Sequence, residues 1–304
     1  MTKPKVTLVT AADMPHLYRG EEGLLDALAQ RGLDPAIRVW NDPDTDWTDA
    51  GMCVVRSVTD YAKDRDSFLR WARSVPRILN HSDILDWNTD KRYLAALADR
   101  GLPTIPTSWL DPAHKLSKHQ IHTRFPAFGD FVVKPSVSSG VRDIGRYSSI
   151  DTYQRQAAIA QTMDLLNHGR SVMVQRYLEE IDVHGEISLV FFNGLVSHAV
   201  EKRPALHPAS VTDPSRHEAV VTAQSADSIA WKWGEEIRQV LHGYVRSRMG
   251  RDEQFLFNRV DVVPDGKGSF HVMEVSLVDA DLYLTATPQA LDNFADAIAM
   301  RAFW

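Results

Sequence analysis

The chain has 304 residues, of which 44% are hydrophobic and 24% charged, the ordinary composition of a globular protein with two or three compact units. The net charge of −6 and the absence of a basic run argue against non-specific binding to nucleic acid. Cys53 is the only cysteine, so an intrachain disulfide is excluded. No stretch approaches the roughly 18 apolar residues of a membrane span, and no signal-peptide pattern opens the chain, so we expect a cytoplasmic protein.

The N-terminal part alternates strand-like and helical segments, a rhythm that predicts a parallel sheet covered by helices. We expect strands at residues 5–10, 36–40, 51–56 and 77–79, and helices at 21–30 and 67–73. Two prolines at 103 and 106 then interrupt the pattern. We therefore place an N-terminal α/β domain at residues 1–106.

Two further units are expected after this link, which makes the fold class α/β with three subdomains. Residues 107–183 read as a small α+β subdomain with a helix near 152–166. Residues 184–304 read as an antiparallel sheet in which Asn193 and Gly194 form a hairpin turn. A helix is expected near 228–248, and a last helix is expected after Thr287 as its N-cap.

Carboxylates occur in two neighbouring apolar segments near the C-terminus, 255–263 and 270–278, which look like strands joined by a Gly-rich turn. Pairing these strands would bring Asp261 near Glu274 and leave Ser276 on the same face as Glu274. Oxygen ligands arranged in this way suit Mg²⁺, which takes one or two carboxylates and leaves positions for phosphate oxygens. The alternative is two solvent-facing acids on an ordinary hairpin.

Two lysines strengthen the metal and phosphate interpretation. Lys91 opens a helical pattern, and Lys134 ends a strand before the small, polar loop 136–140. Such a loop can bring backbone N–H groups onto a phosphate, and lysines act as compact charges on phosphate oxygens. Either lysine alone would read as an ordinary surface residue, whereas the ordered combination with the two late carboxylates is more specific.

In this combination the chain resembles the ATP-grasp superfamily over nearly its whole length. The resemblance is carried by Asn88-Thr-Asp-Lys91, Val132-Val-Lys134-Pro135, Val174-Gln-Arg-Tyr-Leu178, Gly185-Glu186, Arg259-Val-Asp261 and Met273-Glu-Val-Ser276. Within the superfamily the chain resembles the O-ureido-D-serine cyclo-ligase branch through Val54-Val-Arg56-Ser57, Phe191-Phe-Asn-Gly194 and Leu282-Tyr283-Leu284. The chain departs from these relatives at Ser276, where asparagine is usual, and at Asp279-Ala280, where a Glu-Pro pair is frequent.

The superfamily resemblance implies that ATP lies between the second and third units. It implies phosphate contacts from Lys91, Lys134 and Ser139, and a Mg²⁺ site, in which Mn²⁺ can substitute, at Asp261, Glu274 and Ser276. It further implies that adenine lies along the segment formed by Gln175, Arg176, Tyr177 and Leu178. The ribose hydroxyls would be bound by Glu186 or, alternatively, by Asp182. Without the resemblance, the adenine segment would read as an edge strand followed by a polar turn.

The resemblance also implies roles around the reacting groups. Arg259 would lie close to the transferred phosphoryl group or the substrate carboxylate, and Lys202 and Arg203 would face the phosphates or the substrate. Arg56 and Ser57 end a buried strand, where ligands of open parallel sheets collect, so Arg56 is a candidate for a bidentate pair with a substrate carboxylate. A salt bridge from Arg56 to a neighbouring helix is the alternative.

The implied activity is ATP-dependent activation of a carboxylate as an acyl phosphate, followed by attack of a nitrogen. In the suspected branch both groups belong to one molecule, and O-ureido-D-serine closes to D-cycloserine with release of CO2 and ammonia, in antibiotic biosynthesis. An intermolecular carboxylate–amine ligase is the second hypothesis, and a non-catalytic nucleotide-binding protein is the third. The expected partner is a small amino-acid-like substrate, without nucleic acid or membrane, and the interpretation allows for a homodimer.

Overall fold

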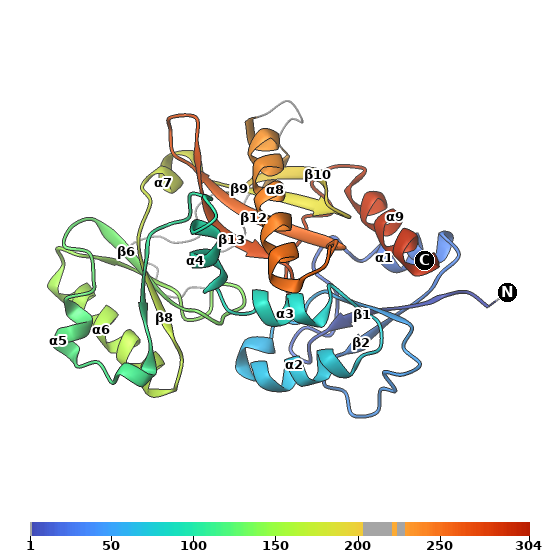
Figure 1. Cartoon of the computed structure of the whole chain (residues 1–304), viewed down its shortest axis with the longest axis horizontal. Helices are drawn as coiled ribbons and strands as arrows, with labels where there is room; N and C mark the ends of the chain where they lie inside the picture. Colours follow the sequence, from blue (N-terminus) through green and yellow to red (C-terminus); the bar gives the residue numbers. More distant parts are fainter. Residues whose placement is uncertain (1, 203–220, 224–228) are drawn as a thin grey trace.

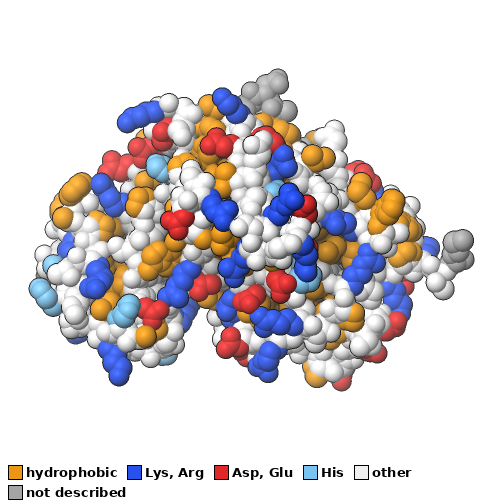
Figure 2. Space-filling model, in the orientation of Figure 1, with side chains coloured by type: hydrophobic (Ala, Val, Ile, Leu, Met, Phe, Trp, Pro, Cys, Tyr) orange, Lys and Arg blue, Asp and Glu red, His pale blue; other side chains and the backbone are white. Residues whose placement is uncertain are grey.

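The computed structural model describes residues 2–202, 221–223 and 229–304, and it contains three separate sheets. Figure 1 shows them as three lobes, with the middle of the chain forming a lobe of its own beside the two terminal parts. On the face drawn in Figure 2, lysines and arginines are interspersed with aspartates and glutamates. Across the described residues, none of the helices combines the length and apolar character needed to cross a bilayer.

The N-terminal sheet is parallel, as the alternating pattern predicted. It has the order β2-β1-β3-β4 and is built from β1 (Lys5–Thr10), β2 (Asp34–Val39), β3 (Met52–Val55) and β4 (Ile78–Leu79). Its strands are joined or followed by α1 (Leu24–Gln30), η1 (Tyr61–Lys63), α2 (Arg65–Ser74) and α3 (Ser82–Asn88). Helix α1 begins later than residue 21, because the fully buried Glu21 is held by Arg56 before the helix starts.

The middle sheet is antiparallel, with the order β5-β8-β6-β7. Its elements are β5 (Thr107–Leu110), η2 (Pro112–His114), α5 (Lys118–His122), β6 (Asp130–Pro135), β7 (Gly145–Ser148), α6 (Thr152–Asn167) and β8 (Val172–Arg176). Helix α6 begins where the sequence predicts, because the Asp151 side chain accepts hydrogen bonds from the first free N–H groups of the helix. Residues 136–144 connect the paired strands β6 and β7.

The C-terminal sheet has the order β11-β10-β9-β12-β13. Its strands are β9 (Glu186–Phe192), β10 (Leu195–Lys202), β11 (Val221–Ala223), β12 (Phe257–Pro264) and β13 (Phe270–Ser276), with α7 (Glu180–His184) preceding them and α8 (Ile229–Met249) packed against β9 and β10. The turn between β9 and β10 has positive φ at Asn193 and Gly194, +47° and +78°. This is the backbone of a tight hairpin, which the Asn-Gly pair predicts.

The last helix, α9 (Ala290–Phe303), begins later than expected. Thr287 is not its N-cap; Gln289 holds that position. The Ala290 N–H instead donates to the Thr287 carbonyl at 3.2 Å, which closes a turn ahead of the helix. Helix α9 then packs on α1 and on the C-terminal sheet, so its residues join the N-terminal and C-terminal cores into one cluster.

The connection from the N-terminal domain is bound tightly to β13. The Asn88 side chain, at the end of α3, donates to the Val275 carbonyl and accepts from the Leu277 N–H, both at 2.7 Å. In α4 (Tyr93–Ala98), the Tyr93 hydroxyl bonds both the carbonyl and the N–H of Val275. These contacts fix the segment that carries Lys91 relative to the strand that carries Glu274.

Candidate active site

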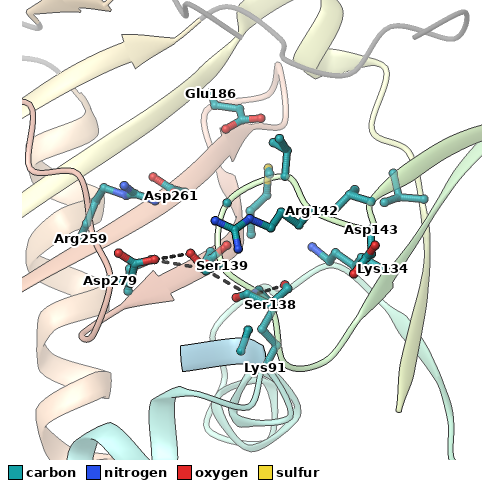
Figure 3. Close-up of a pocket in the computed structure, with 18 of the residues that line it drawn as sticks. Lys91, Lys134, Ser138, Ser139, Arg142, Asp143, Glu186, Arg259, Asp261 and Asp279 are labelled. Carbon is teal, nitrogen blue, oxygen red and sulfur yellow. Dashed lines mark hydrogen bonds and ion pairs between the residues drawn. The ribbon is translucent and has the colours of Figure 1, made fainter. Parts of the chain in front are cut away.

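A cavity of about 1060 Å³ lies where the three lobes meet. Its walls come from the ends of β6 and β8, the loop 136–144, the start of β9, strands β12 and β13, and the segment 278–283. In Figure 3, Lys91, Lys134, Arg142 and Arg259 come together with Glu186, Asp261 and Asp279 around one space. Charged side chains of both signs from all three lobes therefore share one cavity.

Asp261 and Glu274 form the acidic wall of the cavity. They are directly paired across the antiparallel strands β12 and β13, the register that the sequence predicts. Ser276 lies on the face of Glu274, and its hydroxyl donates to the Glu274 carboxylate at 3.2 Å. Across the described part of the chain, no group of three or more His, Cys, Asp or Glu residues is suitably placed to hold a metal. A pair of carboxylates matches a Mg²⁺ site that phosphate oxygens complete.

Two cations of the C-terminal sheet, Lys202 at the end of β10 and Arg259 on the same strand as Asp261, hold Asp261 in its charged form. Lys202 approaches it to 3.3 Å and Arg259 to 3.0 Å, while the Ser188 hydroxyl donates to it as well. Burial by itself raises the pKa of Asp261, but the charges of Arg259 and Lys202 outweigh burial and bring the pKa to about 2. Lys202 also lies 3.2 Å from Glu186, and these two acids raise the pKa of Lys202 despite its burial.

Lys91 joins the acidic wall to the Gly/Ser loop. Its ammonium lies 3.7 Å from the Glu274 carboxylate and donates to both the carbonyl and the hydroxyl of Ser138 at 3.1 Å. The pKa of Glu274 is lowered, because the charge of Lys91 and other cations outweighs the effect of burial. Tyr61, from the N-terminal domain, also donates to the Ser138 carbonyl at 2.9 Å. The loop is thus fastened to two other parts of the chain.

Lys134 ends β6 and faces the cavity with 8% of its surface exposed. Among the described residues, its ammonium makes no ion pair or hydrogen bond. Burial lowers its pKa to about 8, although Glu274, Glu186 and Asp261 act in the opposite direction. A buried ammonium is unfavourable unless a negative charge lies beside it, so Lys134 is a candidate for binding an anion. Phosphate oxygens would supply that negative charge.

The segment predicted to contact adenine borders the same cavity. Gln175, Arg176, Tyr177 and Leu178 all line it at the end of β8. Asp182 is not among the lining residues: it is paired with Arg146 at 3.0 Å and accepts from the Tyr177 hydroxyl at 2.6 Å. Glu186 does line the cavity. Of the two alternatives for the ribose acceptor, the geometry favours Glu186.

Most residues that the sequence singles out come together here. The cavity is lined by Lys91, Lys134, Ser139, Gln175, Arg176, Tyr177, Leu178, Glu186, Lys202, Arg259, Asp261, Glu274 and Ser276. Arg56, Ser57 and Asp182 are not lining residues. Arg203 lies outside the described residues.

Arg56 has the surroundings of a structural ion pair. Its guanidinium is fully buried, donates to Glu21 and to the Ala280 carbonyl, and lies over the rings of Phe257 and Phe294. These contacts favour the alternative that the sequence left open, a salt bridge, although Glu21 precedes the helix rather than lying in it. The adjacent Ser57 hydroxyl donates to a backbone carbonyl at 2.8 Å.

Sequence reasoning assigned no role in the site to three residues of the cavity, and one of them, Asp279, entered only as a departure from the Glu-Pro pair of relatives. Tyr18 and Asp279 line the cavity and are hydrogen-bonded to each other, and Ser139 donates to the same carboxylate. Tyr283 lies near Lys202 and Arg259, with its ring centroid 5.9 and 5.7 Å from their charged groups. Tyr18 carries no local signal at all. Tyr283 stands within a quoted motif, and its φ of +49° marks it as unusual only once the backbone is known.

Comparisons with known proteins identify relatives that match the chain along almost its whole length. The family profile described as "D-cycloserine synthetase DcsG, N-terminal domain" matches residues 6–80. The cycloserine biosynthesis protein DcsG of Streptomyces lavendulae is 30% identical over 302 residues, covering 97% of this chain and 96% of that protein. The crystal structure of D-cycloserine synthetase DcsG superposes with a TM-score of 0.82 at 29% identity, covering 98% and 99% of the two chains.

More distant structures share the architecture. A D-alanine–D-alanine ligase from Bacillus anthracis, solved with ATP, has a TM-score of 0.65 at 13% identity and covers 99% of this chain and 97% of its own. The three-sheet fold is therefore that of the ATP-grasp ligases. Within that class, the chain belongs to the D-cycloserine synthetase DcsG family.

Proposed function

We propose that this enzyme closes O-ureido-D-serine to D-cycloserine at the expense of ATP. The γ-phosphoryl group passes to the substrate carboxylate and gives an acyl phosphate. The nitrogen bonded to the side-chain oxygen then attacks the acyl carbon, expels phosphate and forms the ring amide. Water removes the carbamoyl group as CO2 and ammonia. The proposal is supported by the DcsG relatives, whose names give cycloserine biosynthesis and D-cycloserine synthesis and which match this chain along almost its whole length.

The observation that carries the ATP part of the proposal is the combination of Lys134 with the acidic pair. Lys134 presents to the cavity a buried ammonium that none of the described residues pairs, and Asp261 and Glu274 face the same cavity from β12 and β13. A nucleoside triphosphate with bound Mg²⁺ complements both features. Its negatively charged phosphate oxygens would pair with the Lys134 ammonium, and the carboxylates of Asp261 and Glu274 would coordinate the metal ion. ATP and Mg²⁺ are the cofactors that we assign.

Asp261 and Glu274 are the residues that would hold Mg²⁺, with Ser276 beside them. Mg²⁺ when bound neutralises charge on the phosphate oxygens during phosphoryl transfer. Mn²⁺, which prefers similar oxygen ligands, would substitute for it. The low pKa of Asp261 keeps its carboxylate ionised throughout the neutral range.

Arg259 and Lys202 are the groups that we assign to the reacting end of the substrate. Arg259 is held by the Asp281 carbonyl at 3.0 Å and by Asp261, and Lys202 is held between Asp261 and Glu186. Both are therefore fixed before substrate arrives, which removes the reorganisation that a mobile cation would need. We assign Arg259 to the substrate carboxylate as it becomes phosphorylated, and Lys202 to the developing phosphate charge.

The test supplies ATP, Mg²⁺ and O-ureido-D-serine as the sole amino acid. We expect ADP release, and mass analysis should identify D-cycloserine. Arg259→Ala should abolish both ADP release and trapping of the acyl phosphate by hydroxylamine, whereas Arg246→Ala, on the exposed side of α8, should behave as wild type. ADP release that requires a second amino acid would replace the cyclo-ligase proposal with an intermolecular ligase.

A further inference from the structure

Asp279 differs from the other carboxylates around the cavity in how its charge is compensated. Asp261 is paired with two cations, Glu274 with Lys91, and Glu186 with Lys202. Asp279 makes no ion pair with any described residue. Within the described part of the chain, its carboxylate accepts hydrogen bonds from two neutral hydroxyl groups, those of Tyr18 and Ser139.

These two hydroxyls fix the carboxylate without neutralising it. Tyr18 comes from the N-terminal domain and Ser139 from the Gly/Ser loop, and each holds a different oxygen of Asp279. A carboxylate oxygen has a second lone pair, so both oxygens can still accept from a ligand. Burial raises the pKa of Asp279, although the two hydroxyl hydrogen bonds and the charges of Arg56 and Arg259 act in the opposite direction. The carboxylate is therefore oriented by two hydroxyl groups, lines the cavity and has no cation in direct contact among the described residues.

Arg259 lies within electrostatic reach of this carboxylate. Its positive charge acts to lower the pKa of Asp279, and Figure 3 shows the two side chains facing the same part of the cavity. Asp279 does not form a metal-holding group with Asp261 and Glu274. The ammonium and carboxylate of an α-amino acid are attached to one carbon atom, so their receptors must also be neighbours.

We propose that Asp279 receives the α-ammonium group of the amino-acid substrate while Arg259 holds the carboxylate, so that Asp279 determines specificity for an amino acid over a simple carboxylic acid. The inference rests on the proposed function, which supplies an amino-acid substrate. Tyr18 and Ser139 orient the receptor, and because they come from two different lobes, the receptor is complete only when these lobes meet around the cavity.

Asp281 offers a matched control. It also lines the cavity without an ion pair among the described residues, but its carboxylate accepts from the Tyr283 N–H at 2.9 Å within its own loop. Replacing either aspartate by asparagine removes one negative charge and keeps the side-chain shape. The two substitutions therefore separate a specific contact with the ammonium from a general loss of negative charge.

The experiment compares O-ureido-D-serine with the analogue in which hydrogen replaces the α-amino group. ADP release with each compound gives a ratio of kcat/KM values, and the KM for ATP is measured alongside. We expect wild type and Asp281→Asn to prefer the amino acid by about 10- to 100-fold, the effect of one hydrogen bond between charged groups. In Asp279→Asn the ratio should fall to near one, mainly through the KM of the amino acid, with the KM for ATP unchanged.

The outcomes distinguish this inference from the proposed function. A wild-type enzyme that uses both compounds equally would overturn the role of Asp279 and leave the cyclo-ligase activity intact. This measurement uses the wild-type enzyme alone, so it does not depend on whether a variant folds. A ratio that survives in Asp279→Asn but collapses in Asp281→Asn would move the receptor to Asp281. A wild type that releases no ADP with either compound would overturn both.

Discussion

At the scale of single residues, the state of Lys134 is set by two opposing effects. Burial disfavours its charge, the nearby acids favour it, and burial prevails, so the pKa is lowered from 10.5 to about 8. At neutral pH the side chain is mostly protonated. As the pH rises through about 8 the free enzyme loses this proton, and with it the charge that we assign to the phosphates.

ATP affinity should therefore fall above pH 8, by up to about tenfold per pH unit, because binding must then take up a proton. Lys134→Met should weaken ATP binding at neutral pH and flatten this dependence, whereas Lys118→Met, on the exposed start of α5, should retain both. Calorimetry across the neutral and mildly alkaline range checks both statements. Unchanged ATP affinity in Lys134→Met would remove the residue from the nucleotide site.

The same shift makes a statement about stability. The unfolded chain, in which the pKa of this lysine is near 10.5, binds more protons than the folded chain between about pH 8 and that value. The free energy of unfolding should thus rise with pH across this window. The contribution of Lys134 to this free energy is lowest below the window, where the lysine is protonated in both states. Lys134→Met should accordingly raise Tm at neutral pH, measured by calorimetry. A lower Tm would mean that the nearby acids outweigh burial after all.

Glu274 offers a test of the metal site. Glu274→Gln removes a charged ligand but keeps the shape of the side chain, so turnover should fall by orders of magnitude while the fold persists. Ser276→Ala, which removes only a neutral hydroxyl on the same face, should have a much smaller effect. The measurement is ADP release as the Mg²⁺ concentration is reduced. Near-normal turnover of Glu274→Gln at limiting Mg²⁺ would contradict the assignment.

At the scale of elements, β13 depends on partners far away in the sequence. Asn88 satisfies the carbonyl of Val275 and the N–H of Leu277, both in the interior. Asn88→Ala would leave the Leu277 N–H without its partner, whereas the Val275 carbonyl keeps its bond from the Tyr93 hydroxyl. The free energy of unfolding should therefore fall by about 1–3 kcal/mol, the cost of one buried group left unsatisfied. Urea denaturation measures the loss, and Asn167→Ala, at the exposed end of α6, serves as the control. An equal, small effect of both substitutions would show that water replaces the asparagine.

Most helices and strands were predicted correctly because they are determined by residues that lie close together in the sequence. The hairpin at Asn193 and Gly194 follows from backbone preferences, and the pairing of Asp261 with Glu274 follows from strand period and turn position. The start of α9 was misplaced, because a turn at Thr287 uses the same residue types as a helix cap. The contact of Tyr18 with Asp279 joins residues 261 positions apart, so no local pattern could reveal it.

At the scale of the whole molecule, the Arg56–Glu21 pair links two lobes. The pair belongs to the N-terminal domain, yet Arg56 also bonds the Ala280 carbonyl and lies 4.8 Å from the ring of Phe257, both in the C-terminal part. A broken buried pair leaves an uncompensated charge, which is far more costly than losing a surface pair.

Arg56→Met should therefore lower the free energy of unfolding by about 3–5 kcal/mol, and adding Glu21→Gln should recover part of the loss. Substrate KM of the folded enzyme should stay near wild type. Urea denaturation and steady-state kinetics on the same preparations separate the two effects. Arg56→Met with wild-type stability and a raised substrate KM would restore Arg56 to the substrate site.

The single cysteine has a practical consequence. Cys53 lies on β3 with none of its surface exposed, and burial raises the pKa of its thiol to about 12. Because thiol-directed reagents attack the thiolate, this residue is doubly shielded at neutral pH. The wild-type protein should therefore react little with thiol-directed labels, and an introduced cysteine can be labelled selectively. One cysteine introduced at Tyr153, 88% exposed on α6, would carry a fluorophore that reports movement of the middle lobe in real time as nucleotide arrives.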